Sequence, residues 1–183
     1  ATENTEAYQL YLKGRFYWNK RKAEDLQKAV GYFNQAIEKD PGYALAYAGL
    51  ASTYAILPEY SGLPAKDFIP RTETAARKAL ELDATMAEPH AVLGLIKYQY
   101  QWDWEGAEEE FKRAIELNPN YPTGHHWYSI ALRLQGKFGE ALSEIKRAQE
   151  LDPLSLVITN NVGEVLFYMQ RDDLAIEQFN KVF

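Results

Sequence analysis

Histidine is the residue type in this 183-residue chain that could most readily bind a metal, and it occurs three times. His125 and His126 are adjacent, so on a helix their side chains point about 100° apart. Helical zinc sites instead use histidines three or four positions apart. We therefore predict no metal site, with His90 and His125 as packing residues and His126 as an exposed residue of a groove.

Acidic and basic clusters are best interpreted as solvated surface. Glu108–Glu110 could suggest acid–base catalysis, but Glu108 and Lys112 stand four residues apart in the order that stabilises a helix. Lys20–Lys22 is the one basic cluster. It is too short to indicate a nucleic-acid surface, and the net charge of −6 also argues against one. We expect Lys20–Lys22 to form a solvated turn.

The sequence also lacks the motifs of other common kinds of catalytic site. The chain has no cysteine, which excludes disulfides, thiolate metal sites and cysteine nucleophiles. It contains neither a glycine-rich phosphate loop nor a G-x-S-x-G nucleophile turn. No apolar run approaches the roughly 18 residues of a membrane span, and the polar N-terminus does not resemble a signal peptide. We predict a protein that is not an enzyme and binds no cofactor, and we leave open whether it is cytoplasmic or periplasmic.

The elements that would position binding residues follow from internal repetition. Four aligned segments carry a proline or an alanine at the same place, at positions 41, 84, 119 and 153, and these positions are 43, 35 and 34 residues apart. Across these segments, small residues and Phe or Ile recur at helical spacing before this position, which predicts a helix. A proline at this position ends the helix. The helices predicted in this way are AVGYFNQAIEKDP (29–41), TETAARKALELDA (72–84), AEEEFKRAIELNP (107–119), ALSEIKRAQELDP (141–153) and AIEQFNKVF (175–183), the last of them interrupted.

A partner helix is predicted upstream of each of these segments. Within it a small residue lets the neighbouring helix approach closely, and larger residues flank the small one. The small residues are Gly14, Ala51, Gly94, Ser129 and Gly163.

These residues resemble the tetratricopeptide-repeat (TPR) family, whose pattern is W-x-x-L-G-x-x-Y followed by A, F, A and P. The resemblance extends from about Thr5 to Phe183. It implies an all-α fold, a right-handed superhelix (alpha-alpha solenoid) of about five helix pairs with the last truncated. We expect a single array over residues 1–183, with repeats at approximately 5–42, 43–85, 86–120, 121–154 and 155–183.

Two segments depart from the family pattern. The first repeat has about three extra residues in its inner turn, within 19–25, and the second has a longer insertion, LPEYSGLP, at 57–64. Because the insertion is rich in turn-forming residues, we expect it to be a loop at one edge of the solenoid.

A narrower resemblance concerns the context of the array. Phrases such as YLKGRFYWNKR and YQWDWEGAEEEFKRAIELNPNYPTGHHWY are similar to TPR regions of multidomain bacterial regulators. In those proteins the array follows a serine/threonine kinase, winged-helix or adenylate cyclase domain. We expect this chain to be a fragment of such a regulator, because it stops at Phe183 inside a predicted helix.

In the family, the first helix of each repeat lines the concave side of the superhelix. Carried over position by position, the resemblance implies a concave wall of mixed aromatic, aliphatic, amide and charged residues, of which aromatics and arginine most often anchor partners. The predicted binding residues are Tyr11, Arg15, Trp18, Asn19, Ser52, Ile56, Leu95, Tyr98, Gln99, His126, Ile130, Arg133, Asn160, Glu164 and Phe167.

The resemblance implies a non-enzymatic scaffold that binds a peptide or protein segment in the concave groove. A family subset grips a chain-terminal carboxylate with Lys and Asn, but the matching positions here hold Tyr11, Arg15, Ala48 and Ser52. That clamp is therefore not predicted. The alternative function is a spacer that self-associates through its truncated last repeat. Neither a nucleic-acid partner nor a membrane span is expected in this fragment.

Overall fold

The computed structural model describes residues 2–182, so Phe183 lies outside the described residues. The last helix ends at Phe179 and residues 180–182 form a turn, so the prediction of a helix over 175–183 extends too far. Each repeat contributes two helices. The first helices are α1 (Thr5–Asn19), α3 (Ala44–Ser61), α5 (Ala87–Ile96), α7 (Pro122–Leu134) and α9 (Leu156–Tyr168). The second helices are α2 (Ala23–Lys39), α4 (Ile69–Leu82), α6 (Trp104–Leu117), α8 (Phe138–Leu151) and α10 (Asp172–Phe179), with a 3-10 turn η1 (Ala65–Asp67) before α4 and a π-helical turn η2 (Lys97–Gln101) after α5.

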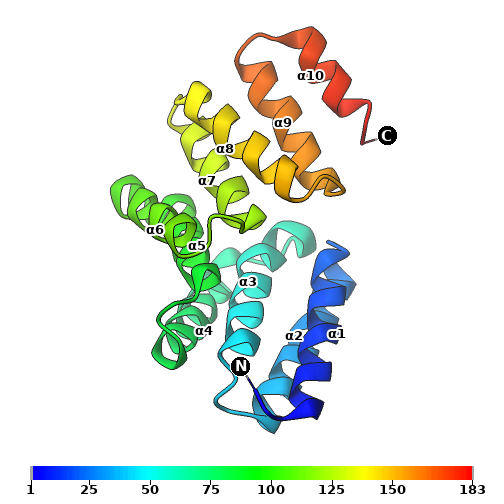
Figure 1. Cartoon of the computed structure of the whole chain (residues 1–183), viewed down its shortest axis with the longest axis vertical. Helices are drawn as coiled ribbons and strands as arrows, with labels where there is room; N and C mark the ends of the chain where they lie inside the picture. The colour runs from blue at the N-terminus through cyan, green and yellow to red at the C-terminus, as the bar shows by residue number, and fades with distance from the viewer. Residues whose placement is uncertain (1, 183) are drawn as a thin grey trace.

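The helix pairs follow one another along an arc. Figure 1 shows the arc running from α1 and α2 through α5 and α6 to α9 and α10, with the two ends of the array on the same side. No strand occurs within residues 2–182. The prediction of an all-α TPR solenoid is confirmed, while its division into five residue ranges stays a prediction. Within the same residues, no helix is long and apolar enough to cross a membrane.

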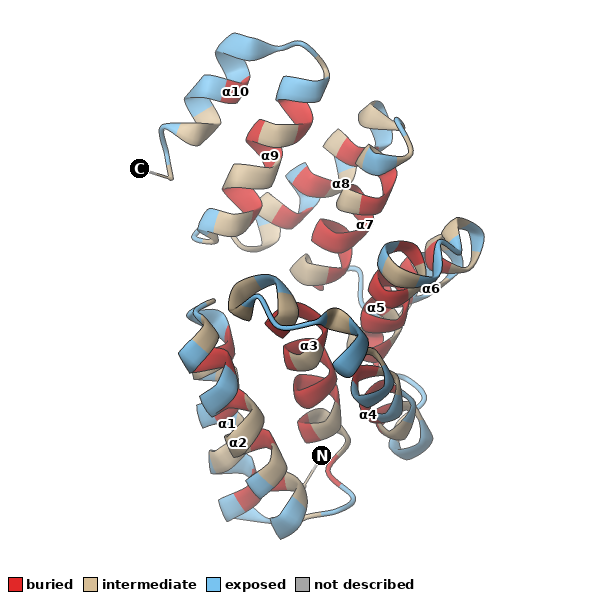
Figure 2. Ribbon diagram, turned by 180° about the vertical axis from the view of Figure 1, so that it is seen from behind, coloured by how far each residue is buried: buried red, intermediate tan, exposed pale blue. Residues whose placement is uncertain are grey.

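The two kinds of helix are buried to different extents, because the first helices lie between neighbours. Eight of the ten residues of α5 are buried, against three of the 14 residues of α6. Figure 2 shows buried residues concentrated on α3, α5, α7 and α9, whereas exposed residues dominate the outer faces of the second helices. A second helix therefore needs only an apolar stripe, as α6 has in Ala107, Phe111 and Ala114.

Close approach of the two helices in a repeat depends on a glycine opposite a phenylalanine. A Cβ atom added to Gly14 would lie 2.6 Å from the Phe33 ring. Gly94 has the same relation to Phe111, at 3.0 Å. The predicted small position is thus the place where the aromatic ring of the second helix lies against the backbone of the first helix.

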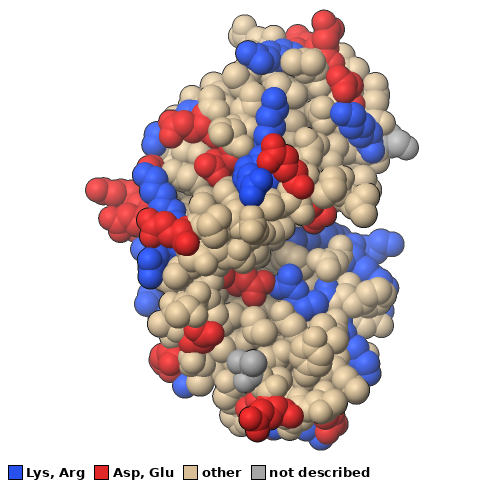
Figure 3. All heavy atoms as spheres, viewed as in Figure 1, with Lys and Arg blue, Asp and Glu red and all other residues tan. Residues whose placement is uncertain are grey.

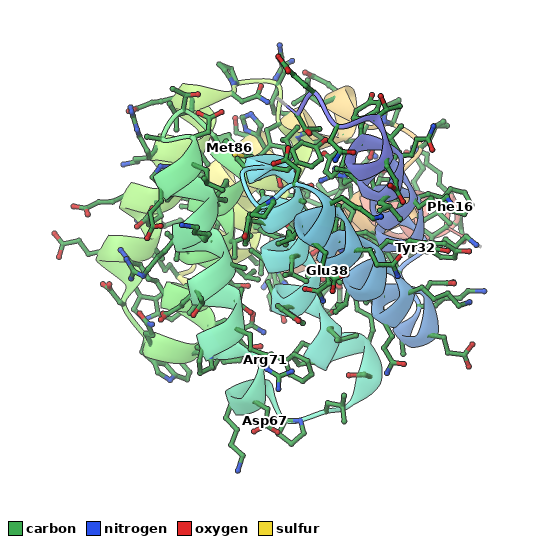
Figure 4. All side chains as sticks on the ribbon, turned by 90° about the horizontal axis from the view of Figure 1, so that it is seen from below. Phe16, Tyr32, Glu38, Asp67, Arg71 and Met86 are labelled. Carbon is green, nitrogen blue, oxygen red and sulfur yellow. The ribbon has the colours of Figure 1, made fainter. Side chains whose placement is uncertain are left out.

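The insertion at 57–64 differs from its prediction as a loop. Helix α3 continues through Pro58 to Ser61 and ends at Gly62, whose φ of 68° supplies the left-handed residue common at helix ends. Ala55, Ile56 and Leu57 are all buried in the core, so packing outweighs the helix-breaking tendency of the proline. Only the part after Gly62 is a loop, and Figure 4 shows Asp67 and Arg71 beside it at a projecting edge.

Candidate functional site

A cavity of about 620 Å³ lies on the concave side and is lined by residues of all five repeats. It is bordered by α3, α5 with η2, α7 and α9, and by the turn between α1 and α2. We call it the central cavity. Nine of the predicted binding residues border it, namely Ile56, Leu95, Tyr98, Gln99, His126, Ile130, Arg133, Asn160 and Glu164.

Three other predicted residues border a separate hollow. Arg15, Trp18 and Asn19 lie there beside the start of α5 and the turn before α7. Arg15 forms an ion pair with Glu88 of α5, so the first and third repeats are joined directly across the superhelix. The predicted concave wall is therefore divided into two neighbouring sites.

The remaining three predicted residues lie outside both hollows. Tyr11 packs against the ring of Tyr43 at a centroid distance of 5.4 Å. Ser52 is 1% exposed, in the core between helices. Phe167 is 59% exposed and contacts Tyr168 on the last pair of helices.

Arg133 is held by neighbours inside the array. Its Nη2 lies 3.1 Å from Glu164 Oε2, and its guanidinium lies over the ring of Tyr168, 5.1 Å from the ring centroid. The amide of Asn160 donates a hydrogen bond of 3.0 Å to Glu164. The two charges in this part of the cavity therefore neutralise each other.

His126 corrects the prediction of an exposed groove residue, because it is 7% exposed. Burial, together with the charges of Arg21 and Arg133, lowers its pKa to about 3. The ring is therefore neutral near pH 7. Its Nε2 has no hydrogen-bond partner among residues 2–182.

The other two histidines lie between the helices of one repeat, as predicted for packing residues, and each also contacts a glutamate. His90 Nδ1 lies 2.7 Å from Glu110 Oε2. His125 Nδ1 lies 2.6 Å from Glu144 Oε2, and its Nε2 lies 3.0 Å from the carbonyl oxygen of Pro119. Burial lowers the pKa of His125, but these two hydrogen bonds outweigh burial and raise it above the ordinary value.

Unpartnered polar atoms gather along the concave side. Five buried side-chain polar atoms lack a hydrogen-bond partner among the described residues, and four of them belong to predicted binding residues. Buried polar groups are normally paired, so each such atom requires an explanation. The four are Trp18 Nε1, Ser52 Oγ, His126 Nε2 and Arg133 Nε.

Arg21 is a residue of the cavity that the sequence prediction missed. Instead of lying in a solvated turn, it is partly buried and its guanidinium lies 3.7 Å from the centre of the Trp18 ring. Its φ of 52° is in the left-handed region, which non-glycine residues adopt rarely. Nothing in the local sequence distinguishes it from Lys20 and Lys22, so only the fold could identify it.

The charges on this side of the molecule are unevenly distributed. Figure 3 shows a face hollowed between the two halves of the array, with Lys and Arg side chains gathered along one flank of the hollow. This local basic flank contrasts with the net charge of −6 for the whole chain. This flank of the hollow is thus more basic than the chain as a whole.

The fold and the concave wall together define a helical-repeat solenoid. Residues 96–155 match the family model described as tetratricopeptide repeat. The TPR family is therefore supported by this match as well as by the architecture.

Three curated proteins illustrate the sequence similarity. Superkiller protein 3 of Schizosaccharomyces pombe is 26% identical over 96% of this chain. The type IV pilus assembly protein PilF of Pseudomonas aeruginosa is 29% identical over 57% of this chain, and a small glutamine-rich TPR-containing protein of Mycosarcoma maydis is 32% identical over 43%. The matches span 12%, 42% and 22% of the lengths of these three relatives.

Solved structures show the same fold at low identity. TTC0263, a TPR protein of Thermus thermophilus, superimposes with a TM-score of 0.75 at 18% identity, over 96% of this chain and 89% of that chain. Pseudomonas aeruginosa pilF gives a TM-score of 0.65 at 17% identity, over 97% and 77% of the two chains. YrrB, described as a TPR protein with an unusual peptide-binding site, gives 0.53 at 24% identity over 87% and 77%.

Proposed function

We propose that this array is a scaffold that binds a segment of another protein in its concave groove. The fold itself suggests a protein–protein interaction scaffold, and the central cavity is the observation that carries the finer proposal. Residues of all five repeats line it, so a segment lying in it would contact several helices at once. Repeat arrays present such surfaces already formed, which lowers the ordering cost of binding.

The composition of the cavity fits a peptide better than a small reactive substrate. Leu95 and Ile130 provide apolar contact, while Gln99 and Asn160 provide amides that can hydrogen-bond to a peptide backbone. The same mixture of apolar surface and a few placed polar groups is typical of recognition sites.

The test begins with a phage library of random peptides selected on the full chain. Peptides that emerge are synthesised, and their affinities are measured by fluorescence anisotropy. Ile130→Glu places a charge in the cavity and is expected to weaken binding about tenfold or more. The matched control is Leu82→Glu, an equivalent change at a 38% exposed residue of α4, which is expected to leave affinity unchanged.

Two results would contradict the proposal. Equal affinity for wild type and Ile130→Glu would remove the cavity from the binding site. A library that yields no peptide above background would reject an extended segment as the ligand. Self-association and the context of a bacterial regulator stay predictions beside this proposal.

A further inference from the structure

Arg21 presents a set of hydrogen-bond donors to the central cavity. Its guanidinium lies over the face of the Trp18 ring at 3.7 Å, and the side chain borders the cavity. Stacking uses the face of the guanidinium and leaves its in-plane N–H groups free to donate. Among residues 2–182 these groups have no hydrogen-bond acceptor, since Tyr60 and Glu59 act on Arg21 by charge alone.

The backbone holds Arg21 in this position at a conformational cost. Its φ of 52° lies where a non-glycine residue is disfavoured by about 1–2 kcal/mol. Such conformations persist when the surrounding structure enforces them, and they are concentrated at functional sites. Here the enforced geometry turns the side chain back over Trp18 toward the cavity instead of into solvent.

His126 supplies a second donor from the opposite helix of the cavity. The side chain is almost fully buried, and Nε2 has no partner among the described residues. A neutral imidazole can donate one N–H hydrogen bond. The ring borders the cavity, so a group that enters the cavity can approach it.

The acidic groups of the cavity do not satisfy these donors. Glu164 already forms an ion pair with Arg133 and accepts a hydrogen bond from Asn160, and Glu59 is an exposed residue of the lining. The unpartnered buried polar atoms of the cavity among residues 2–182 are two nitrogens, His126 Nε2 and Arg133 Nε, and Arg21 adds a positively charged donor. The natural complement of these groups is an acceptor that carries negative charge.

We propose that the central cavity recognises an aspartate or glutamate side chain of the bound segment, with Arg21 and His126 as the donors to its carboxylate. This proposal rests on the groove-binding function proposed above. It identifies the partner as a protein segment with an acidic side chain at the position that enters the cavity. A carboxylate at a chain end has the same chemistry, and the experiment distinguishes the two sources.

The experiment uses pools of random decapeptides with both ends blocked and one central position fixed. That position is Glu in one pool and the isosteric Gln in the other, and a third pool has fixed Gln with a free C-terminal carboxylate. Binding to the full chain is measured by fluorescence anisotropy. The Glu pool is expected to bind about tenfold more tightly than the blocked Gln pool, as for a hydrogen-bonded charge.

Variants assign the preference to individual residues. Arg21→Gln and His126→Phe are expected to reduce the Glu preference at least severalfold, while Arg21→Lys retains part of it because the charge remains. The control is Lys22→Gln, which removes one positive charge from an exposed residue of the same turn and is expected to retain the full preference. Circular dichroism and thermal unfolding confirm that each variant is folded before it is titrated.

The outcomes separate this proposal from the groove function. Equal binding of the Glu and Gln pools overturns the acidic-side-chain proposal and leaves groove binding supported. Binding of only the free-carboxylate pool identifies a chain end as the ligand and also overturns it. If Lys22→Gln loses as much of the Glu preference as Arg21→Gln, the preference comes from the overall charge and the proposed role of Arg21 is overturned. If no pool binds, both proposals are rejected.

Discussion

At the level of single residues, His125 and His126 are adjacent in the chain but lie in opposite electrostatic surroundings. His126 is neutral in the folded chain because burial and two arginines lower its pKa to about 3. His125 faces Glu144 and the Pro119 carbonyl, which raise its pKa despite burial. The two residues should therefore contribute to stability with opposite dependence on pH.

The sign for each residue follows from comparison with an unfolded pKa of about 6.5. Below that pH the unfolded chain protonates His126 and the folded chain does not, so stability falls by about 2 kcal/mol on going to pH 5. The stabilisation by His125 is present below about pH 6.5 and is lost as the pH rises through its raised folded-state pKa.

Urea unfolding of wild type, His126→Phe and His125→Gln between about pH 5 and pH 8 tests this. The free energy of unfolding of wild type relative to that of His126→Phe is expected to decrease as the pH is lowered. The free energy of unfolding of wild type relative to that of His125→Gln is expected to decrease as the pH is raised. Parallel slopes for the two differences would contradict the assigned surroundings.

For single residues, the sequence predicts the place in the repeat better than it predicts the groups that surround the side chain. The repeat register places His126 on α7, where it borders the central cavity, but its burial depends on helices that are distant in sequence. The partners of Arg15 and Arg133, namely Glu88 and Glu164, lie 73 and 31 residues further along the chain. Repeat position alone does not identify such pairs.

At the level of helices, Phe33 of α2 fixes the approach of both α1 and α3. Cβ atoms added to Gly14 and Gly49 would lie 2.6 and 2.5 Å from its ring. Gly31 lies in the same helix as Phe33, but a Cβ atom there would meet nothing within 4 Å. Two glycine-to-alanine changes therefore have opposite expected effects.

Gly49→Ala should destabilise the chain by about 1–2 kcal/mol, because overpacking outweighs the better helix propensity of alanine. Gly31→Ala should stabilise it by about 0.5–1 kcal/mol, since only helix propensity changes. Thermal and urea unfolding measure both. Stabilisation by Gly49→Ala would show that the Phe33 ring can move aside at little cost.

Helix boundaries show where local rules are insufficient. Proline and glycine in 57–64 favour a loop, yet three consecutive buried residues before Pro58 extend α3 into it. The π-helical turn η2, which carries Tyr98 and Gln99 to the cavity, replaces the regular helix expected from the pattern. In both places tertiary packing selects a backbone that local propensity does not favour.

At the level of the whole molecule, the Arg15–Glu88 ion pair joins α1 to α5 across the intervening second repeat. Its side chains are 28% and 14% exposed, so the pair is shielded more than a surface ion pair. Most contacts in a solenoid join adjacent repeats. This pair should therefore couple the first and third repeats energetically.

A double-mutant cycle with Arg15→Met and Glu88→Gln measures that coupling. We expect an interaction free energy of about 1 kcal/mol from the unfolding free energies of the four proteins. The control cycle uses Lys78 and Glu81, an exposed pair within α4, for which no measurable coupling is expected. Additive effects of Arg15→Met and Glu88→Gln would mean that the pair does not join the repeats.

The contact between a glycine and a phenylalanine also constrains how such a chain can change over generations. The first, third and fifth repeats combine Gly with Phe, while the corresponding positions hold Ala51 with Ala76 in the second and Ser129 with Ile145 in the fourth. In both repeats where a larger residue replaces the glycine, a smaller residue replaces the phenylalanine. In diverging lineages we expect paired replacements at these two sites, since a single replacement would leave either a clash or a void.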